Sequence, residues 1–227
     1  MPGAALEIEG LSVRGARGRA LLDVPRFALP AGTALAVRGP SGAGKSTFLH
    51  ALAGLVPAAA GAVRWDGEDI AALPEPARAA FRRRRVGFVF QEHLLFEELS
   101  APENAAIAAL YGPRAGRDAV HGRGRDRLAE LGLDPGETRR SDTYSGGERQ
   151  RIAVARALAT DPAILLADEP TASLDRANAD RLAAELVRLA HEEGRTLVAV
   201  SHDPALHAVA DRVIDLADGR ITEDAAP

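Results

Sequence analysis

Residues 39–46 read Gly-Pro-Ser-Gly-Ala-Gly-Lys-Ser and fit the phosphate-binding pattern G-x-x-x-x-G-K-[ST]. The glycines let successive backbone N–H groups face one anion. Lys45 has the reach to contact β- and γ-phosphates, and the Ser46 hydroxyl is a ligand for Mg²⁺. The segment lies between an apolar run and a helical pattern, which favours this reading over a glycine-rich turn without function. The predicted nucleotide contacts are Gly39, Pro40, Ser41, Gly42, Ala43, Gly44, Lys45, Ser46 and Thr47.

Lys45 is the only lysine among 28 cationic residues, the other 27 being arginine. Arginine is a planar fork of five donors, whereas lysine is a compact charge on a flexible stem. A chain so biased toward arginine that keeps one lysine at this position indicates a tight site for that ammonium group.

Two carboxylates, Asp168 and Glu169, follow the apolar run 164–167. Ligands of parallel sheets bind at the carboxyl ends of the strands, so we expect both acids to face the phosphate-binding loop. Asp168 is placed to hold Mg²⁺, through water, and Glu169 to accept a proton from an attacking water. The alternative, a solvated acidic turn, is weaker here because the pair supplies what nucleotide hydrolysis requires.

A second candidate anion site is the segment Thr143 to Gln150, where Ser145, Gly146 and Gly147 open a predicted helix. A helix N-terminus with a hydroxyl and two glycines presents several donors to a phosphate. One nucleotide does not need two such loops. We therefore expect each loop to serve a different copy of the chain, with two nucleotides held between head-to-tail protomers.

The composition is that of one large domain, or of a core with an inserted subdomain: 227 residues, 46% hydrophobic and 26% charged. The net charge of -4 argues against a nucleic-acid partner bound by bulk electrostatics. With no cysteine there is no disulfide framework or thiolate chemistry. No apolar run is long enough to span a membrane, and the first residues lack a signal-peptide pattern, so we expect a cytoplasmic location.

The elements that position these residues alternate between strands and helices, which predicts an α/β sheet covered on both faces. Residues 92–142 are polar and helical and are the candidate inserted subdomain. Trp65 is read as a packing residue. Expected strands cover 6–13, 33–38, 61–70, 86–90, 164–167 and 197–200, with a last one near Ile221; expected helices cover 46–55, 147–160 and 176–192; the region Pro25 to Gly32 connects the first two strands.

Over nearly its whole length the chain resembles the nucleotide-binding subunits of ATP-binding cassette (ABC) transporters. It has, in the order of that family, the phosphate loop 39–46, Gln91, the signature 144–150, the pair Asp168 and Glu169, the loop 173–175 and His202. The resemblance implies a P-loop NTPase core with a parallel sheet, an N-terminal antiparallel β subdomain and an inserted α-helical subdomain. It divides a single domain, 1–227, into a core with β subdomain (1–91 and 161–227) and a helical subdomain (92–160) that includes the signature helix.

The resemblance also implies roles. Gln91 resembles the residue that contacts Mg²⁺ and the water and links the site to the helical subdomain. His202 resembles the histidine that contacts the γ-phosphate, and Asp175 lies in the loop that senses the opposite protomer. With Lys45 and the opposite Ser145 and Gly147, these groups would stabilise charge that develops on the γ-phosphate.

Two segments depart from the family pattern. The signature usually reads Leu-Ser-Gly-Gly-Gln, whereas this chain has Tyr144 and Glu148; the glutamate is similar to the branch for lipoprotein release, macrolide efflux and cell division. The family usually stacks an aromatic on adenine within the segment corresponding to 11–19, which has none here. Arg14 or Arg17 stacking on the base, and a disordered surface loop, are the alternatives.

The resemblance therefore implies the ATPase subunit of a membrane transporter, using ATP and Mg²⁺. It would dimerise with a second copy or a homologous ATPase subunit and drive a separate integral membrane permease, in export or extraction from the membrane. Its location would be the inner face of the cell membrane, held there by the permease. The alternatives are a soluble ABC-type ATPase acting on DNA or ribosomes, and the ATPase of an importer. The run Arg82 to Arg85 is read as a solvated helix end, or else as a contact for acidic groups of a membrane partner or anionic lipid headgroups.

Overall fold

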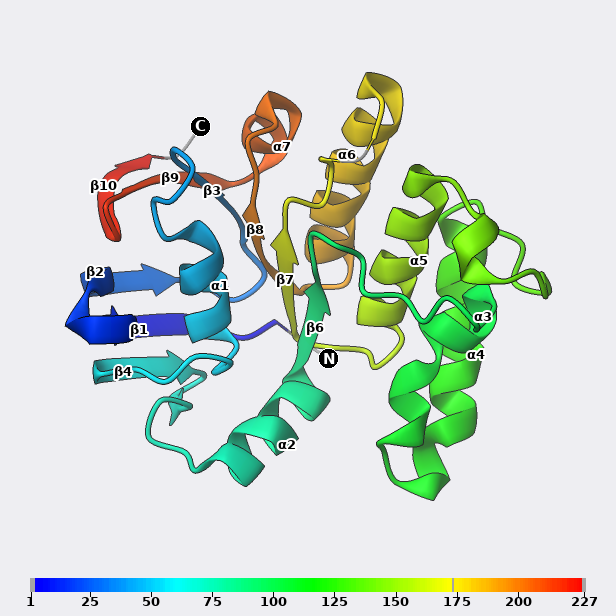
Figure 1. Cartoon of the computed structure of the whole chain (residues 1–227), viewed down its shortest axis with the longest axis horizontal. Helices are drawn as coiled ribbons and strands as arrows, with labels where there is room; N and C mark the ends of the chain where they lie inside the picture. The colour runs from blue at the N-terminus through cyan, green and yellow to red at the C-terminus, as the bar shows by residue number, and fades with distance from the viewer. Residues whose placement is uncertain (1–2, 173, 226–227) are drawn as a thin grey trace.

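The structure, a computed structural model of the chain, describes residues 3–172 and 174–225, with only the backbone at residue 17. Two sheets lie side by side, and helices cover the larger one (Figure 1). The strands are β1 (Leu6–Arg14), β2 (Ala20–Leu29), β3 (Ala34–Arg38), β4 (Ala60–Trp65), β5 (Glu68–Asp69), β6 (Val86–Val89), β7 (Ile164–Asp168), β8 (Thr196–Val200), β9 (Arg212–Ala217) and β10 (Arg220–Ala225).

The larger sheet has the strand order β10-β9-β3-β8-β7-β6. Its strands from β9 to β6 pair in parallel, and β10 folds back antiparallel onto β9. Strands β7 and β8 are buried along their whole length, as expected for a sheet covered on both faces. The carboxyl ends of the central strands meet at one edge, which is where ligands of such sheets bind.

The smaller sheet is antiparallel, in the order β2-β1-β4-β5. Strand β2 was not predicted from the sequence, and the prediction that Pro25 to Gly32 is a connection is wrong, because residues up to Leu29 pair with β1. Proline lacks the N–H that a central strand needs. Pro25 is tolerated because β2 is the edge strand of this sheet. The expected antiparallel β subdomain is confirmed.

The main core lies between the two sheets, with α1 inside it. Phe48 and Leu49 of this helix are fully buried among apolar residues from both sheets. Trp65, at the end of β4, is also fully buried, and its indole N–H donates to the Leu52 carbonyl at 2.9 Å. The interpretation of Trp65 as a packing residue is confirmed.

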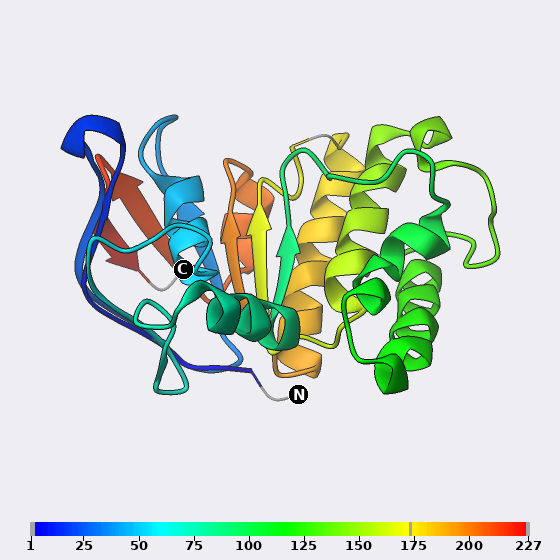
Figure 2. The same ribbon diagram turned by 60° about the horizontal axis from the view of Figure 1, so that its bottom comes forward.

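A second core fills the opposite face of the parallel sheet, beneath α5 and α6. Farther from the sheet, α3, α4 and α5 pack around a small cluster of their own (Figure 2). The α-helices are α1 (Lys45–Leu52), α2 (Glu75–Arg85), α3 (Ala101–Ala105), α4 (Arg117–Glu130), α5 (Gly146–Leu158), α6 (Arg176–Glu192) and α7 (Pro204–Val209); short 3-10 segments cover Ala16–Gly18, Ile107–Leu110, Arg114–Gly116 and Ser141–Thr143. The expected fold class is confirmed, while the subdomain limits at residues 92 and 160 stay a prediction.

The arginine run ends α2, and half of it is held by the chain itself. Arg82 donates to the Gly54 carbonyl at 2.8 Å and pairs with Glu75 at 2.6 Å, and Arg85 pairs with Asp66. Arg83 and Arg84 are exposed, as for a solvated helix end. Within residues 3–172 and 174–225, no helix combines the length and apolar character needed to cross a membrane.

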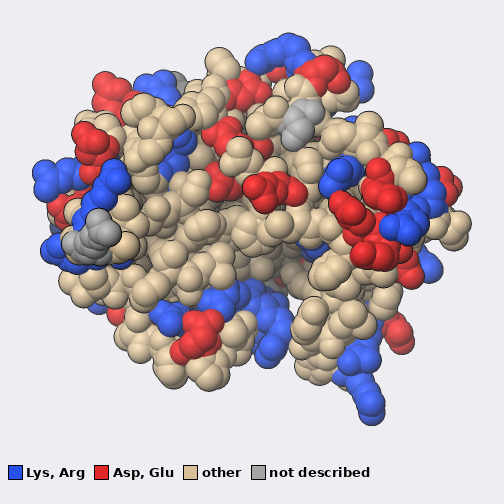
Figure 3. All heavy atoms as spheres, viewed as in Figure 1, with Lys and Arg blue, Asp and Glu red and all other residues tan. Residues whose placement is uncertain are grey.

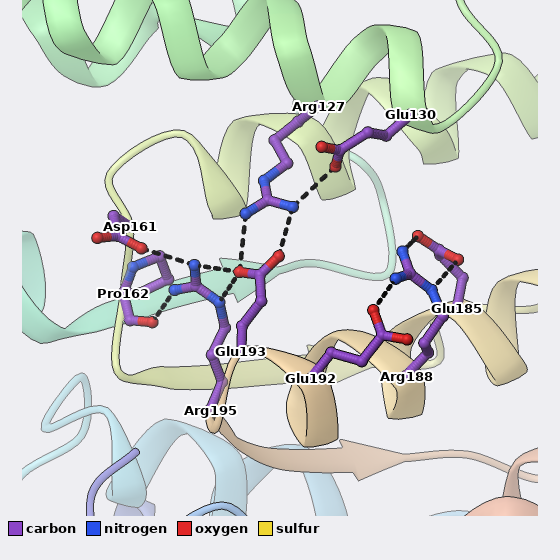
Figure 4. A network of polar contacts seen from close by, with 9 residues as sticks. All are labelled: Arg127, Glu130, Asp161, Pro162, Glu185, Arg188, Glu192, Glu193 and Arg195. Atoms are coloured by element: carbon purple, nitrogen blue, oxygen red, sulfur yellow. Dashed lines mark hydrogen bonds and ion pairs between the residues drawn. The ribbon is translucent and has the colours of Figure 1, made fainter. Parts of the chain in front are cut away.

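A network of ion pairs joins α4 to the turn between α6 and β8 (Figure 4). Glu193 accepts from Arg127 of α4, at 2.6 Å, and from Arg195, at 2.5 Å. The Arg195 side chain is almost fully buried and also contacts Asp161 at 2.6 Å and the Pro162 carbonyl. The network therefore fastens the helical part of the chain to the core through one carboxylate.

Replacing Glu193 with Gln should lower the free energy of unfolding by about 2 kcal/mol, because a buried guanidinium loses its shared charge partner. Burial raises the pKa of Glu193, but the hydrogen bonds from Arg127 and Arg195 outweigh it and hold the pKa below its ordinary value of 4.5. The stabilisation is therefore complete above pH 4.5 and is lost as the pH falls below it. Urea titrations at pH 7 and pH 4 measure this.

The matched control is Glu192→Gln, because Glu192 is exposed and pairs with Arg188 on the same helix. It should change the unfolding free energy by less than about 0.5 kcal/mol. Equal losses in the two variants would show that the network adds no stability.

Candidate functional site

The phosphate-binding loop runs from the end of β3 to the start of α1, and its glycines are required by its shape. Gly39 has φ +147°, and a Cβ there would stand 2.0 Å from the Leu216 carbonyl oxygen. Gly44 has φ +101°, with a Cβ 2.8 Å from the Leu21 carbonyl oxygen. Residues with side chains fit neither position. The loop is thus wedged against β9 and β2, and α1 begins directly after it.

Lys45 begins α1 and is 8% exposed. Its ammonium donates to the Gly39 carbonyl at 2.8 Å and the Pro40 carbonyl at 3.1 Å, and lies 3.1 Å from Nε2 of His202. Across the described part of the chain, no carboxylate pairs with it. An incoming phosphate therefore replaces backbone carbonyl partners of the ammonium and breaks no ion pair with a described carboxylate, which keeps the cost of exchange low.

The two carboxylates at the end of β7 differ in their surroundings. Asp168 is 6% exposed, and its Oδ1 is buried without a hydrogen-bond partner in the part of the chain that the structure describes. The Glu169 backbone has φ +48° and donates to the Val200 carbonyl at 2.9 Å. The Glu169 carboxylate accepts from the backbone N–H of His202 at 3.2 Å and lies 3.5 Å from Nε2 of that residue. The left-handed backbone turns Glu169 away from the strand and beside His202.

These groups line one cleft of about 1020 Å³. Acidic side chains gather near the centre of this face, beside the ends of the central strands (Figure 3). Of the residues expected in the site, the cleft is lined by Ser41, Gly42, Gly44, Lys45, Ser46, Thr47, Gln91, Asp168, Glu169 and His202. Gly39, Pro40 and Ala43 complete the loop without lining the cleft.

The cleft also contains residues that the sequence analysis missed. Asp203 caps α7 by accepting from the Ala205 N–H at 2.9 Å, and it pairs with Arg176 at 2.9 Å. Burial raises the pKa of Asp203, but hydrogen bonds from Ala205, Thr171 and Arg176 outweigh it and keep the pKa low. The sequence holds one signal for this residue, the Asp-Pro pair that opens a helix.

The end of the cleft nearest β2 is lined by Arg19, Ala20 and Leu21. Arg14, one of the two candidates for contact with the base, is not among the lining residues and donates to the Gly18 carbonyl at 3.2 Å. The side chain of Arg17, the other candidate, lies outside what the structure describes.

The signature residues, and Asp175 of the separate loop 173–175, stand apart from this cleft. Ser145 caps α5, and Asp175 caps α6 by accepting from the Asn178 N–H at 3.1 Å. Ser145, Gly146, Gly147 and Asp175 do not line the cleft that holds Lys45. Helices α1 and α5 begin toward the same edge of the molecule but on opposite sides of β7 and β8 (Figure 1). One chain therefore displays both anion-binding loops without bringing them together.

Comparison with known proteins identifies the family. Residues 22–172 match the ABC transporter family. The chain is 41% identical to the lipoprotein-releasing system ATP-binding protein LolD of Chromohalobacter salexigens, over 97% of this chain and 94% of that protein. It is 43% identical to the Fe(3+) ions import ATP-binding protein FbpC of Streptomyces coelicolor, spanning 63% of it, and 43% identical to the macrolide export protein MacB 1/2 of Paracoccus denitrificans, spanning 29% of it.

Among solved structures, the dimeric ABC transporter cassette MJ0796 matches with a TM-score of 0.87 and 29% identity, over 97% of this chain and 98% of that one. A post-hydrolysis dimer of MJ0796 bound to ADP and Pi matches with a TM-score of 0.83. The chain belongs to the ABC transporter family. It is an ATP-binding and ATP-hydrolysing subunit of a transporter.

Proposed function

We propose that this chain forms half of a shared ATP site, in which a second copy or a homologous ATPase subunit supplies the other half. The observation that carries the proposal is the separation of the two anion-binding loops. The loop at Lys45 lines the cleft, while α5, which Ser145 caps, begins toward the same edge on the other side of β7 and β8 (Figure 1). A two-fold rotation brings the signature of each copy over the phosphate loop of the other and makes two equal sites.

In the proposed site, the backbone N–H groups of residues 39–47 and the Lys45 ammonium bind the phosphates. Ser46, Gln91 and Asp168 would hold Mg²⁺. The fit is supported by Asp168, whose buried Oδ1 has no hydrogen-bond partner among the described residues and suits a water of the ion's shell. Bound Mg²⁺ would neutralise charge on the β- and γ-phosphate oxygens.

We assign the proton transfer to Glu169. As the water oxygen attacks the γ-phosphorus and the bond to the β-phosphate oxygen breaks, the water proton passes to the Glu169 carboxylate. His202 orients that carboxylate through its backbone N–H, and its ring, 3.1 Å from the Lys45 ammonium, would contact the γ-phosphate. Asp175 caps α6 and follows Leu174, which packs close to Gly147 of the signature, so Asp175 would sense the second copy.

We further propose that ATP hydrolysis drives a separate membrane permease in export or extraction from the membrane, at the inner face of the cell membrane. The similarity to LolD extends over almost the full length of both chains. FbpC, an Fe(3+) ions import protein, matches at comparable identity, so import is the competing direction.

The test is a vesicle assay with the chain and its permease co-reconstituted so that the ATPase faces outward. We expect added ATP to detach lipid-anchored protein from the bilayer into the vesicle lumen, on the side away from the ATPase, and the Glu169→Gln variant to detach none. ATP-dependent movement of Fe³⁺ across the membrane without release of anchored protein would instead support the importer.

A further inference from the structure

The signature of this chain differs from the usual family pattern at Tyr144 and Glu148, and the two residues are joined by an arginine. The Arg139 guanidinium lies 3.7 Å from the centre of the Tyr144 ring. The same guanidinium pairs with Oε1 of Glu148 at 2.8 Å. Tyr144 is 6% exposed and packs in the core of the helical subdomain. The ring thus anchors a cation in the loop that precedes the signature.

The other oxygen of Glu148 occupies the donors of Ser145. The Ser145 backbone N–H and hydroxyl each donate to Oε2 of Glu148 at 2.8 Å. The hydrogen bond from the Ser145 backbone N–H, reinforced by those from its hydroxyl and from Arg139, holds the pKa of Glu148 below its ordinary value. The signature therefore carries a charged carboxylate on the groups that a phosphate must contact.

This arrangement raises a problem for an ATP shared between two copies. The γ-phosphate and Glu148 compete for the Ser145 donors, and two negative groups a few ångströms apart repel one another. The usual glutamine of the family has no charge and no such conflict. Arg139 removes this conflict. It pairs with Oε1 of Glu148, whereas Ser145 donates to Oε2, so the pair with Arg139 can persist when a phosphate takes the Ser145 donors.

We propose that Arg139 is a positioning residue of the shared ATP site. The ATP bound by the opposite copy displaces the Glu148 carboxylate from Ser145. Arg139, held on the Tyr144 ring, then keeps that carboxylate in place and neutralises its charge. The inference rests on the proposed function, since it requires that ATP meet the signature of a second copy. It assigns Tyr144, Arg139 and Glu148 to one unit that replaces the neutral glutamine.

The test measures ATP-driven dimerisation by sedimentation velocity, with all variants in a Glu169→Gln background to prevent hydrolysis. Arg139→Gln should weaken dimerisation on the order of tenfold, because the Glu148 charge is left beside phosphate. Arg139→Lys, which keeps the charge, should lose less. The matched control is Arg140→Gln, which removes an adjacent exposed charge that pairs with Asp142 at 3.4 Å and not with Glu148; it should leave dimerisation unchanged.

The decisive variant is Arg139→Gln combined with Glu148→Gln. If Arg139 acts by neutralising Glu148, the double variant regains the dimerisation of Glu148→Gln alone. A double variant as weak as Arg139→Gln, or a single variant equal to its parent, would overturn the inference while leaving the shared site intact. Binding of a fluorescent ATP analogue to the monomer should be equal in all variants, which shows that each is folded. A Glu169→Gln parent that stays monomeric with ATP would instead refute the shared site itself.

Discussion

Replacing Glu169 with Gln is expected to leave ATP binding intact and to lower turnover by roughly 10²-fold or more, the range for loss of a general base. Glutamine keeps the shape of the side chain and accepts the His202 N–H as the carboxylate does, at 3.2 Å in the parent. It lacks only the capacity to take the proton. Steady-state phosphate release gives the turnover rate, and a separate equilibrium binding measurement gives the affinity for ATP.

The same variant should shift toward dimer with ATP, because the step that separates the copies is blocked. Glu192→Gln, which removes an exposed carboxylate that does not line the cleft, is the control and should hydrolyse ATP at the parental rate. Turnover near the parental rate in Glu169→Gln would show that another group accepts the proton.

Damage to either anion-binding loop should abolish turnover, but in two distinguishable ways. Lys45→Ala removes the ammonium that faces the phosphates, and we expect it to weaken nucleotide binding by roughly 10²-fold, a loss of about 2.7 kcal/mol. Ser145→Arg places a bulky cation on the signature, and we expect ATP binding to persist while dimerisation and hydrolysis fail. Equilibrium binding and turnover assays separate the two. Tight ATP binding by Lys45→Ala would place the lysine outside the site.

Much of the fold followed from pattern because local signals and core packing agree. The helix expected over 176–192 occupies those residues, with Asp175 as its N-cap and Gly194 just past its end. The apolar runs that become β7 and β8 are buried on both faces, so their composition alone marks them. In contrast, β2 was not predicted, because a proline such as Pro25 argues against a strand unless that strand lies at the edge of its sheet. The edge position of β2 depends on the order of all the strands in the sheet, which local sequence does not give.

The residues of the candidate site also fall into those that the sequence predicts and those that it does not. The phosphate loop and the carboxylate pair have fixed spacing and were located from sequence, and the cleft brings Lys45, Asp168 and Glu169 together. The pairing of Arg139 with Glu148 has no such spacing rule, since it depends on the path of a loop. Asp203 joins Arg176 from a distant part of the chain. Contacts of this kind are set by tertiary packing and not by local pattern.

The central claim is that each ATP site is built from two copies of the chain, and mixing the two loop variants tests it most directly. In a heterodimer of Lys45→Ala and Ser145→Arg, the intact phosphate loop of the Ser145→Arg chain meets the intact signature of the Lys45→Ala chain and forms one complete site. The second site carries both defects. We expect ATP-dependent pairing to return on mixing, with up to half of the parental hydrolysis if the two sites act independently. Failure of both pairing and hydrolysis to recover, with both variants shown by circular dichroism to be folded, would contradict the shared site.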